Sequence, residues 1–188
     1  MFTDVEGSTR RWEADADEMR AALAAHDLVL RGAIEAHGGW LFKHTGDGMC
    51  AAFGSPRSAV EAAVAAQRAL ELPVRTGIAT GEAELRGADY FGTVLNRAAR
   101  VMAAGHGGQI LLAESTAVLL SGVDLIDLGP RRFRDLPTPV QVFQVQAEGL
   151  RTDFPSLRAL DVGPGNLRPA TTSLIGREFE VREIETIK

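Results

Sequence analysis

Two short segments each contain an aspartate, one at the end of an expected strand just before a glycine turn and the other at an expected hairpin tip. The first is Phe2–Thr9 (FTDVEGST), which contains Asp4, and the second is Phe42–Gly48 (FKHTGDG), which contains Asp47. Two carboxylates and a backbone carbonyl form a hard-oxygen site suited to Mg²⁺ or Mn²⁺, and substrate phosphates can complete the coordination shell. Aspartate is also common at helix caps and in turns, so either segment alone indicates only local structure.

A third segment, Asp89–Arg100, places an amide and a guanidinium on one helix face, because Asn96 and Arg100 are four residues apart. Such a pair can hold a ribose and stabilise negative charge that develops on a phosphoryl group. In isolation, however, this pattern is typical of a solvated helix face.

The basic residues are unevenly divided: 18 of the 20 are Arg, and only Lys43 and Lys188 are Lys. A compact ammonium is not equivalent to a planar guanidinium, so Lys43 indicates either a position that needs an ammonium or chance. The sequence leaves these two interpretations open.

Apolar periodicity and turn residues predict the elements that would position these side chains. The expected elements are strand 1–5, helix 10–37, a hairpin with strands 40–42 and 49–53, helix 56–70, strand 74–80, helix 93–103, strand 110–112, helix 115–120, and short strands 123–128, 132–136 and 140–145. The first six follow the order βαββαβ, which predicts an α+β ferredoxin-like sheet with an appended helix and strands. The first and third strands are neighbours in that sheet, so Asp4 and Asp47 are expected to converge at one edge.

Composition limits the possible functions. A chain of 188 residues with 45% hydrophobic side chains can bury a core, and the single cysteine, Cys50, fits a reducing cytosol. No membrane span or secretory signal is evident, so we expect a cytoplasmic protein that does not bind membranes. Residues 131–188 contain nine basic and eight acidic side chains, which leaves residues 1–130 with 11 and 17, a net charge of −6. This balance argues against nucleic-acid binding and is compatible with a carboxylate metal site.

The three motifs, in this order, strongly resemble the class III nucleotidyl cyclase catalytic domain. The resemblance runs from Met1 to about Gln146 and includes Phe133–Leu136 and Val140–Phe143, and we therefore expect a catalytic domain at 1–147. The short segment between Thr80 and Phe91 is similar to the bacterial subgroup that has a short dimerisation arm. Members of the family usually carry several apolar residues before Phe-Thr-Asp, so the first strand is expected to be short and frayed here.

The resemblance implies a role for each motif residue. In the family, a Lys/Asp pair goes with adenine, and its adenylate cyclases use two Mg²⁺ or Mn²⁺ ions to convert ATP to 3′,5′-cyclic AMP and pyrophosphate. The implied roles are metal binding by Asp4, Asp47 and the Val5 carbonyl, purine recognition by Lys43 and Asp89, ribose orientation by Asn96, transition-state stabilisation by Arg100, and phosphate contact by Arg134.

The resemblance also implies a homodimer. One chain would supply the two aspartates of a site, and its partner would supply the purine, ribose and transition-state residues. The alternative function is a catalytically weak or inactive cyclase-like module that dimerises or senses nucleotide for a transcriptional regulator.

The C-terminal part has a different character. Pro155, Gly163–Gly165 and Pro169 predict a linker over 148–170. Asn166–Pro169 and Thr172–Glu178 are similar to the beginning of the ATPase module of large bacterial transcriptional regulators, so we expect 171–188 to be the start of an incomplete second domain. No phosphate-binding loop is present in it.

Overall fold

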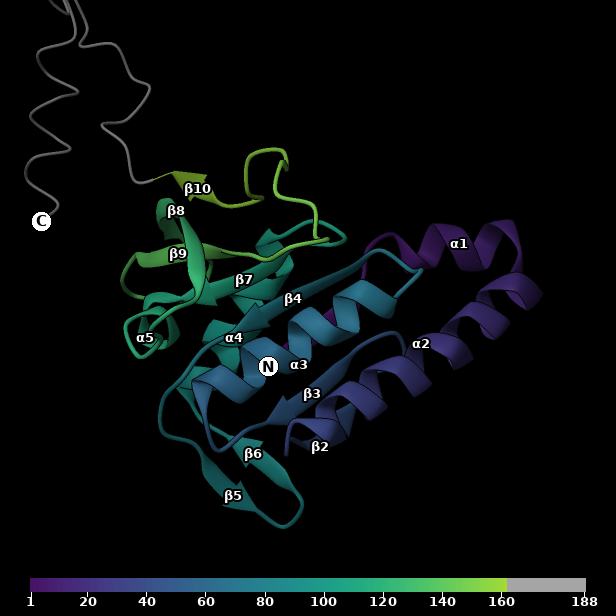
Figure 1. Ribbon diagram of the computed structural model, residues 1–188, viewed down its shortest axis with the longest axis horizontal. Helices are drawn as coiled ribbons and strands as arrows, with labels where there is room; N and C mark the ends of the chain where they lie inside the picture. Colours follow the sequence, from purple (N-terminus) through teal and green to yellow (C-terminus); the bar gives the residue numbers. More distant parts are fainter. Residues whose placement is uncertain (162–188) are drawn as a thin grey trace, which may run out of the picture.

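The computed structural model describes residues 1–161, which form an eight-stranded sheet, a separate two-stranded hairpin and five helices (Figure 1). The elements are β1 (Phe2–Val5), α1 (Ser8–Ala14), α2 (Ala16–Ala36), β2 (Trp40–His44), β3 (Met49–Ala52), α3 (Pro56–Ala69), β4 (Val74–Ile78), β5 (Glu84–Arg86), β6 (Asp89–Phe91), α4 (Thr93–Ala104), β7 (Ile110–Ala113), α5 (Glu114–Ala117), β8 (Asp124–Arg132), β9 (Val140–Gln146) and β10 (Leu160–Asp161).

The large sheet has the strand order β10-β8-β9-β7-β4-β1-β3-β2. Its β4-β1-β3-β2 half is antiparallel and has the ferredoxin-like arrangement, so the predicted fold is confirmed. Helix α4 then connects β4 to β7, which is parallel to it, and β9, β8 and β10 extend the sheet.

Strand β1 is short but lies between two partners. It pairs with β3 on one side and with β4 on the other, and the buried Met1 amine donates a hydrogen bond to the Ala51 carbonyl. Burial lowers the pKa of this amine to about 5. The fraying expected for this strand is therefore absent from the structure.

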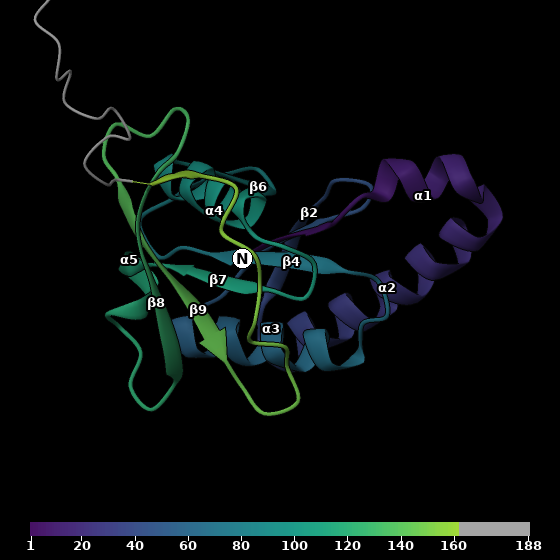
Figure 2. The ribbon, with the colours of Figure 1, turned by 90° about the horizontal axis from the view of Figure 1, so that it is seen from above.

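Helices cover both faces of the sheet, with α2 and α3 on one face and α4 on the other (Figure 2). Alternation along β7 matches these two layers. Ile110 and Leu112 belong to the core cluster with α2 and α3, whereas Leu111 and Ala113 belong to the cluster with α4. Helix α1 buries no residue, and within residues 1–161 no helix is both long and apolar enough to cross a membrane.

The structure corrects three local predictions. The single helix expected over 10–37 breaks at Asp15, whose extended backbone and side-chain carboxylate cap α2. Residues 132–136 are not a strand: β8 continues to Arg132, and a turn follows in which Leu136 N–H donates to the Phe133 carbonyl. The polar segment after β4 contains the β5–β6 hairpin. The sequence analysis did not predict this hairpin, because its strands are short and carry polar residues.

The first part of the expected linker lies against the domain. Leu157 is buried in the core cluster that contains Phe133 and Val142, and β10 pairs with β8. The rest of the expected linker, from residue 162, and the expected second domain at 171–188 lie outside the described residues.

Close backbone contact holds α4 on the sheet. A Cβ at Gly77 of β4 would lie 2.4 Å from the Met102 nitrogen and 2.6 Å from the Ala98 oxygen, both backbone atoms of α4. Only glycine therefore allows this helix to approach β4 so closely.

We expect Gly77→Ala to lower the free energy of unfolding by about 2–3 kcal/mol, because the added methyl overpacks this contact. Gly32→Ala is the matched control, since Gly32 lies in α2 with open space around its Cβ position. It should raise stability by about 0.5–1 kcal/mol. Urea denaturation of both variants measures the two effects, and equal stabilities would contradict the proposed contact.

Candidate active site

An ion pair between Asp4 and Arg75 lies at the end of β1. Asp4 lies opposite Arg75 in the β1–β4 register, and Asp4 Oδ2 accepts from Arg75 Nε at 2.7 Å and lies 2.6 Å from Nη2. Both side chains are about three-quarters buried. Arg75 also reaches the Ala103 carbonyl in the last turn of α4 at 3.3 Å, so this pair links β1, β4 and α4.

Asp47 lies beside this pair at the tip of the β2–β3 hairpin. Val5 N–H donates to the Asp47 carbonyl at 3.2 Å, and Thr45 N–H closes the turn onto the Gly48 carbonyl at 2.9 Å. A Cβ at Gly48 would lie 2.2 Å from the Thr3 carbonyl oxygen, so glycine is required for the hairpin to meet β1. The chain thus brings Asp47 next to Val5, although 42 positions separate them.

The backbone at this corner also directs the Val5 carbonyl toward the side on which Asp47 lies. Glu6 N–H donates to the Pro73 carbonyl on the β4 side. Because a trans peptide is planar, the Val5 carbonyl points the opposite way, toward the side on which Asp47 lies. The partly buried Asp47 carboxylate makes no hydrogen bond or ion pair within residues 1–161.

These donors fit a hard divalent cation. A half-buried carboxylate without a partner favours a bound cation, and a carbonyl and a second carboxylate lie at the same corner. Among residues 1–161, no three Asp, Glu, His or Cys side chains form a metal-binding group. A metal at this corner would therefore need oxygen ligands from water or substrate, as Mg²⁺ commonly does.

Lys43 and Asp89 meet at a different place. Lys43 Nζ lies 2.5 Å from Asp89 Oδ2, and Tyr90 N–H donates to Asp89 Oδ1 at 2.9 Å. The hydrogen bond between the two side chains raises the pKa of Lys43 and lowers the pKa of Asp89. With Asn96, they line a pocket of about 540 Å³ whose remaining walls are largely apolar.

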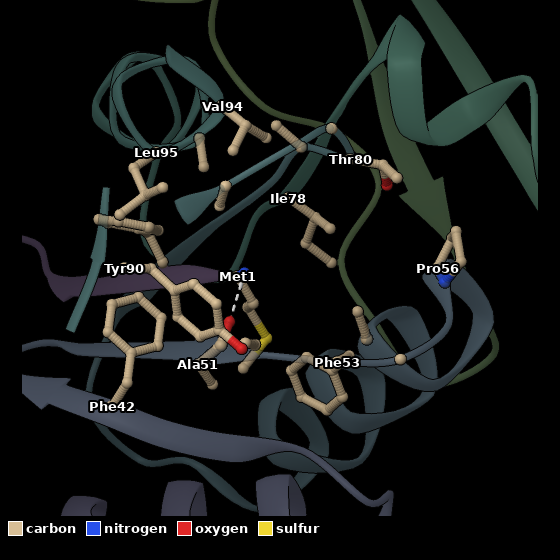
Figure 3. A pocket seen from close by; sticks show the side chains of 18 of the residues that line it. Met1, Phe42, Ala51, Phe53, Pro56, Ile78, Thr80, Tyr90, Val94 and Leu95 are labelled. Carbon is tan, nitrogen blue, oxygen red and sulfur yellow. Dashed lines mark hydrogen bonds between the residues drawn. The ribbon is translucent and has the colours of Figure 1, made fainter. Parts of the chain in front are cut away.

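Aromatic side chains pack against one another beside the Lys43–Asp89 pair. The Phe42 and Tyr90 ring centroids are 5.2 Å apart and the Trp40 and Tyr90 centroids 5.5 Å apart, both in edge-to-face geometry. Behind them is a separate cavity of about 300 Å³, in which Phe42 and Tyr90 lie together on one side and Pro56 on the other (Figure 3). None of the side chains that line this cavity is charged.

Asn96 and Arg100 are both exposed on α4, one turn apart. Arg100 Nη2 lies 2.6 Å from Asp135 Oδ2, in the turn between β8 and β9. Asp135 adopts a left-handed backbone with φ of 66°. Arg100 lines a pocket of about 580 Å³ together with three further arginines, Arg132, Arg134 and Arg158.

The predicted site residues therefore form two groups on one chain. Lys43, Asp89 and Asn96 share a pocket, and Arg100 and Arg134 share the arginine-lined pocket. Neither of these pockets includes the second group, Asp4, Val5 and Asp47.

Sequence reasoning missed Arg75 and Asp135, the ion-pair partners of two predicted residues. For Arg75 a signal was present, because a charged residue within the apolar strand Val74–Ile78 is unusual, and the predicted sheet order places that strand beside β1. The sequence carried no such signal for Asp135, because residues 132–136 were predicted to form a strand.

His44, between Lys43 and Asp47 in sequence, has a supporting role in the hairpin. Its Nε2 lies 3.1 Å from Asp27 Oδ2 of α2, and the other Asp27 oxygen lies 2.9 Å from Nδ1 of the buried His26. These contacts connect the hairpin to the helix layer.

We expect Lys43→Met to raise the pKa of Asp89 toward its ordinary value, because it removes the hydrogen bond that stabilises the carboxylate. The pair stabilises the fold above the unfolded-state pKa of Asp89, and this contribution is lost as the pH falls through the lower folded-state value. Side-chain carboxyl NMR shifts against pH measure the change. Glu84, whose pKa is lowered by Arg86, is an internal control that should not move. An unchanged Asp89 titration would show that the contact is not formed in solution.

Known proteins similar to this chain include nucleotidyl cyclases. An uncharacterised protein of Mycobacterium tuberculosis is 35% identical over 191 residues, which span 96% of this chain and 67% of that protein. A receptor-type adenylate cyclase of Trypanosoma congolense is 30% identical over 214 residues, spanning 84% of this chain and 29% of the much longer relative. No protein-family model matches the chain.

Among solved structures, an adenylate cyclase of Trypanosoma brucei, determined in its monomeric state, superposes with a TM-score of 0.76 at 28% identity. The match covers 84% of this chain and 92% of that one. On the fold, the motifs and these relatives together, the chain has strong structural and sequence similarity to class III adenylate/guanylate cyclase catalytic domains.

Proposed function

We propose that this chain is an adenylate cyclase that converts ATP to 3′,5′-cyclic AMP and pyrophosphate at sites shared by two copies of the chain. The observation that carries the proposal is the Lys43–Asp89 pair beside Asn96 in one pocket, while the carboxylates lie elsewhere on the chain. A purine- and ribose-binding half and a metal-binding half would be completed by a second copy.

The Lys43–Asp89 pair suits adenine. Ring N1 of adenine accepts a hydrogen bond and its 6-amino group donates one, so an ammonium and a carboxylate side by side match that edge. Guanine reverses the order of donor and acceptor along the same edge. Because each side chain holds the other at 2.5 Å, the pair would meet the base already oriented.

The remaining residues would act on the ribose and the phosphates. Asn96 would orient the ribose so that its 3′-hydroxyl faces the α-phosphorus, and pyrophosphate would leave from the opposite side. Arg100, with Arg134 nearby, would stabilise the negative charge that develops on the phosphoryl group. Arg100 would exchange its bond to Asp135 for one to phosphate.

Asp4, Asp47 and the Val5 carbonyl would hold Mg²⁺ or Mn²⁺. Bound there, the metal would supply Lewis-acid polarisation of the attacking hydroxyl and the phosphate oxygens. Arg75 contacts only Oδ2 of Asp4, so Oδ1 would be available to the cation.

The separation of the two halves on one chain supports a homodimer as part of the proposal. A head-to-tail pair related by a two-fold axis would bring the Asp4–Asp47 corner of one chain to the Lys43, Asn96 and Arg100 surface of the other, twice. A monomer would then be inactive.

The second candidate is a catalytically weak or inactive cyclase-like module. One observation favours it: in the single chain, Asp4 is bound to Arg75 and Arg100 to Asp135, so two groups needed for catalysis are engaged internally. A folded chain that forms no cyclic nucleotide with Mn²⁺ at any concentration would support this alternative.

We expect the purified chain with Mn²⁺ to form cyclic AMP from ATP faster than cyclic GMP from GTP, with specific activity that rises with protein concentration. Asp47→Ala should lower kcat by about a hundredfold or more, because it removes a ligand worth several kcal/mol of charge stabilisation. Asp124→Ala, on exposed β8, is the control and should leave kcat unchanged. Product chromatography measures each rate, and an unaffected Asp47→Ala enzyme would refute the metal assignment.

We further expect two inactive variants to complement each other. Asp47→Ala and Arg100→Ala alter different halves, so a mixed dimer keeps one intact site, and an equal mixture should recover about a quarter of the wild-type activity. Asp47→Ala mixed with Asp4→Ala is the matched control, because both changes fall in the same half and no site is restored. Equal activity in the two mixtures would contradict a shared site.

A further inference from the structure

Residues 151–161, here called the strap, return across the domain after β9. The segment that follows β9 runs from the side of the molecule that carries α3 to the side that carries α4 (Figure 2). Gln144 Nε2 donates to the Thr152 carbonyl at 2.8 Å, and the strap ends in β10 against Arg131 and Arg132 of β8. Leu157 of the strap is buried in the core.

The strap is attached to the loop that follows α4. His106 stacks on Phe154 with ring centroids 6.5 Å apart and an interplanar angle of 9°, and its Nε2 lies 3.1 Å from the Ser156 carbonyl, to which it donates. Arg158 N–H donates to the Ala104 carbonyl at 2.9 Å and so satisfies one of the free carbonyls at the end of α4.

The Arg158 side chain extends from the strap to Glu6. Its guanidinium pairs with Glu6 Oε1, and the other carboxylate oxygen accepts from Gly107 N–H at 2.7 Å. The Arg158 guanidinium also lies 3.3 Å from His106 Nδ1, which is free to accept because the ring proton is on Nε2. Both oxygens of Glu6 are therefore occupied, one by the strap and one by the loop after α4.

Glu6 shares a peptide group with Val5. The Glu6 N–H to Pro73 hydrogen bond and the Val5 carbonyl direction belong to the same rigid plane. On one side of that plane, the two contacts of the Glu6 carboxylate hold Glu6 in place. On the other side, the hydrogen bond from Val5 N–H to the Asp47 carbonyl holds Val5 in place. The orientation of the Val5 carbonyl thus depends on Glu6, and Glu6 depends on Arg158.

We propose that Arg158 is a positioning residue for the metal-binding corner, acting through Glu6, and that the strap is part of the catalytic unit. The proposal deepens the cyclase function and rests on it for its consequence in catalysis. Its structural part, that Arg158 holds the Val5–Glu6 backbone in place, is independent of that function.

The test uses the full chain with Arg158→Gln, Glu6→Gln, the double variant and Arg151→Gln. Arg151 is the matched control, because it is in the same strap and lies over the Phe154 ring at 4.7 Å without reaching Glu6. Amide hydrogen exchange at Val5 and Glu6 should be at least about fivefold faster in Arg158→Gln and unchanged in Arg151→Gln. This measurement needs neither ATP nor activity.

The second measurement is the Mn²⁺ dependence of cyclic AMP formation. Arg158→Gln and Glu6→Gln should each raise the Mn²⁺ concentration for half-maximal activity about tenfold and lower kcat, as changes that disturb metal-ligand orientation do. The KM for ATP should stay within about twofold, since Lys43, Asp89 and Asn96 are not affected, and the double variant should be no worse than Glu6→Gln alone.

The outcomes separate the two hypotheses. An inactive wild-type chain overturns the proposed function, and hydrogen exchange alone then decides whether Arg158 positions Val5 and Glu6. An active wild type in which Arg158→Gln behaves like Arg151→Gln in either measurement overturns the inference. Parallel losses of kcat and thermal stability in all four variants, without a change in Mn²⁺ dependence, would indicate a structural role and overturn it as well.

Discussion

The central position of β1 is the constraint on which the candidate site depends. The strand has only four residues, yet it pairs with β3 and β4, and its last peptide groups bond outward on both sides, Val5 to Asp47 and Glu6 to Pro73. Any shift of β1 by one residue would turn Asp4 toward the opposite face, because side chains alternate along a strand. Gly48 allows the hairpin to approach β1 closely, since a Cβ there would lie 2.2 Å from the Thr3 carbonyl oxygen.

Three charged groups of the candidate site are paired within the single chain, whereas Asp47 has no such partner among residues 1–161. Asp4 is held by Arg75, Lys43 by Asp89, and Arg100 by Asp135. The Lys43–Asp89 and Arg100–Asp135 pairs are substantially exposed, so breaking them costs little free energy. The Asp4–Arg75 pair, in contrast, is largely desolvated. Under the proposed metal binding, a divalent cation at Asp4 would offset the loss of this largely desolvated pair if Arg75 were displaced. The pairings also fix the side-chain orientations of Asp4, Lys43 and Arg100 in the single chain.

Helix α4 relates the two halves of the site. Its exposed face carries Asn96 and Arg100, its last turn receives Arg75 and Arg158, and its close approach to β4 at Gly77 sets its height above the sheet. The strap completes this arrangement from a part of the sequence with no resemblance to the catalytic motifs. The contacts around α4 and the end of β1 thus include the strap, beyond the stretch that the motifs mark.

The sequence by itself determined the βαββαβ order, the strand-end position of Asp4, the hairpin-tip position of Asp47, and the shared helix face of Asn96 and Arg100, because each follows from local periodicity and turn residues. It missed the break at Asp15, the β5–β6 hairpin and the turn at 133–136, where short polar segments carry weak patterns. Only the tertiary structure decided the partners: Arg75 on Asp4, Asp135 on Arg100, and Arg158 on Glu6. Such contacts join residues up to 152 positions apart, and their formation depends on sheet order and chain return, which no local pattern encodes.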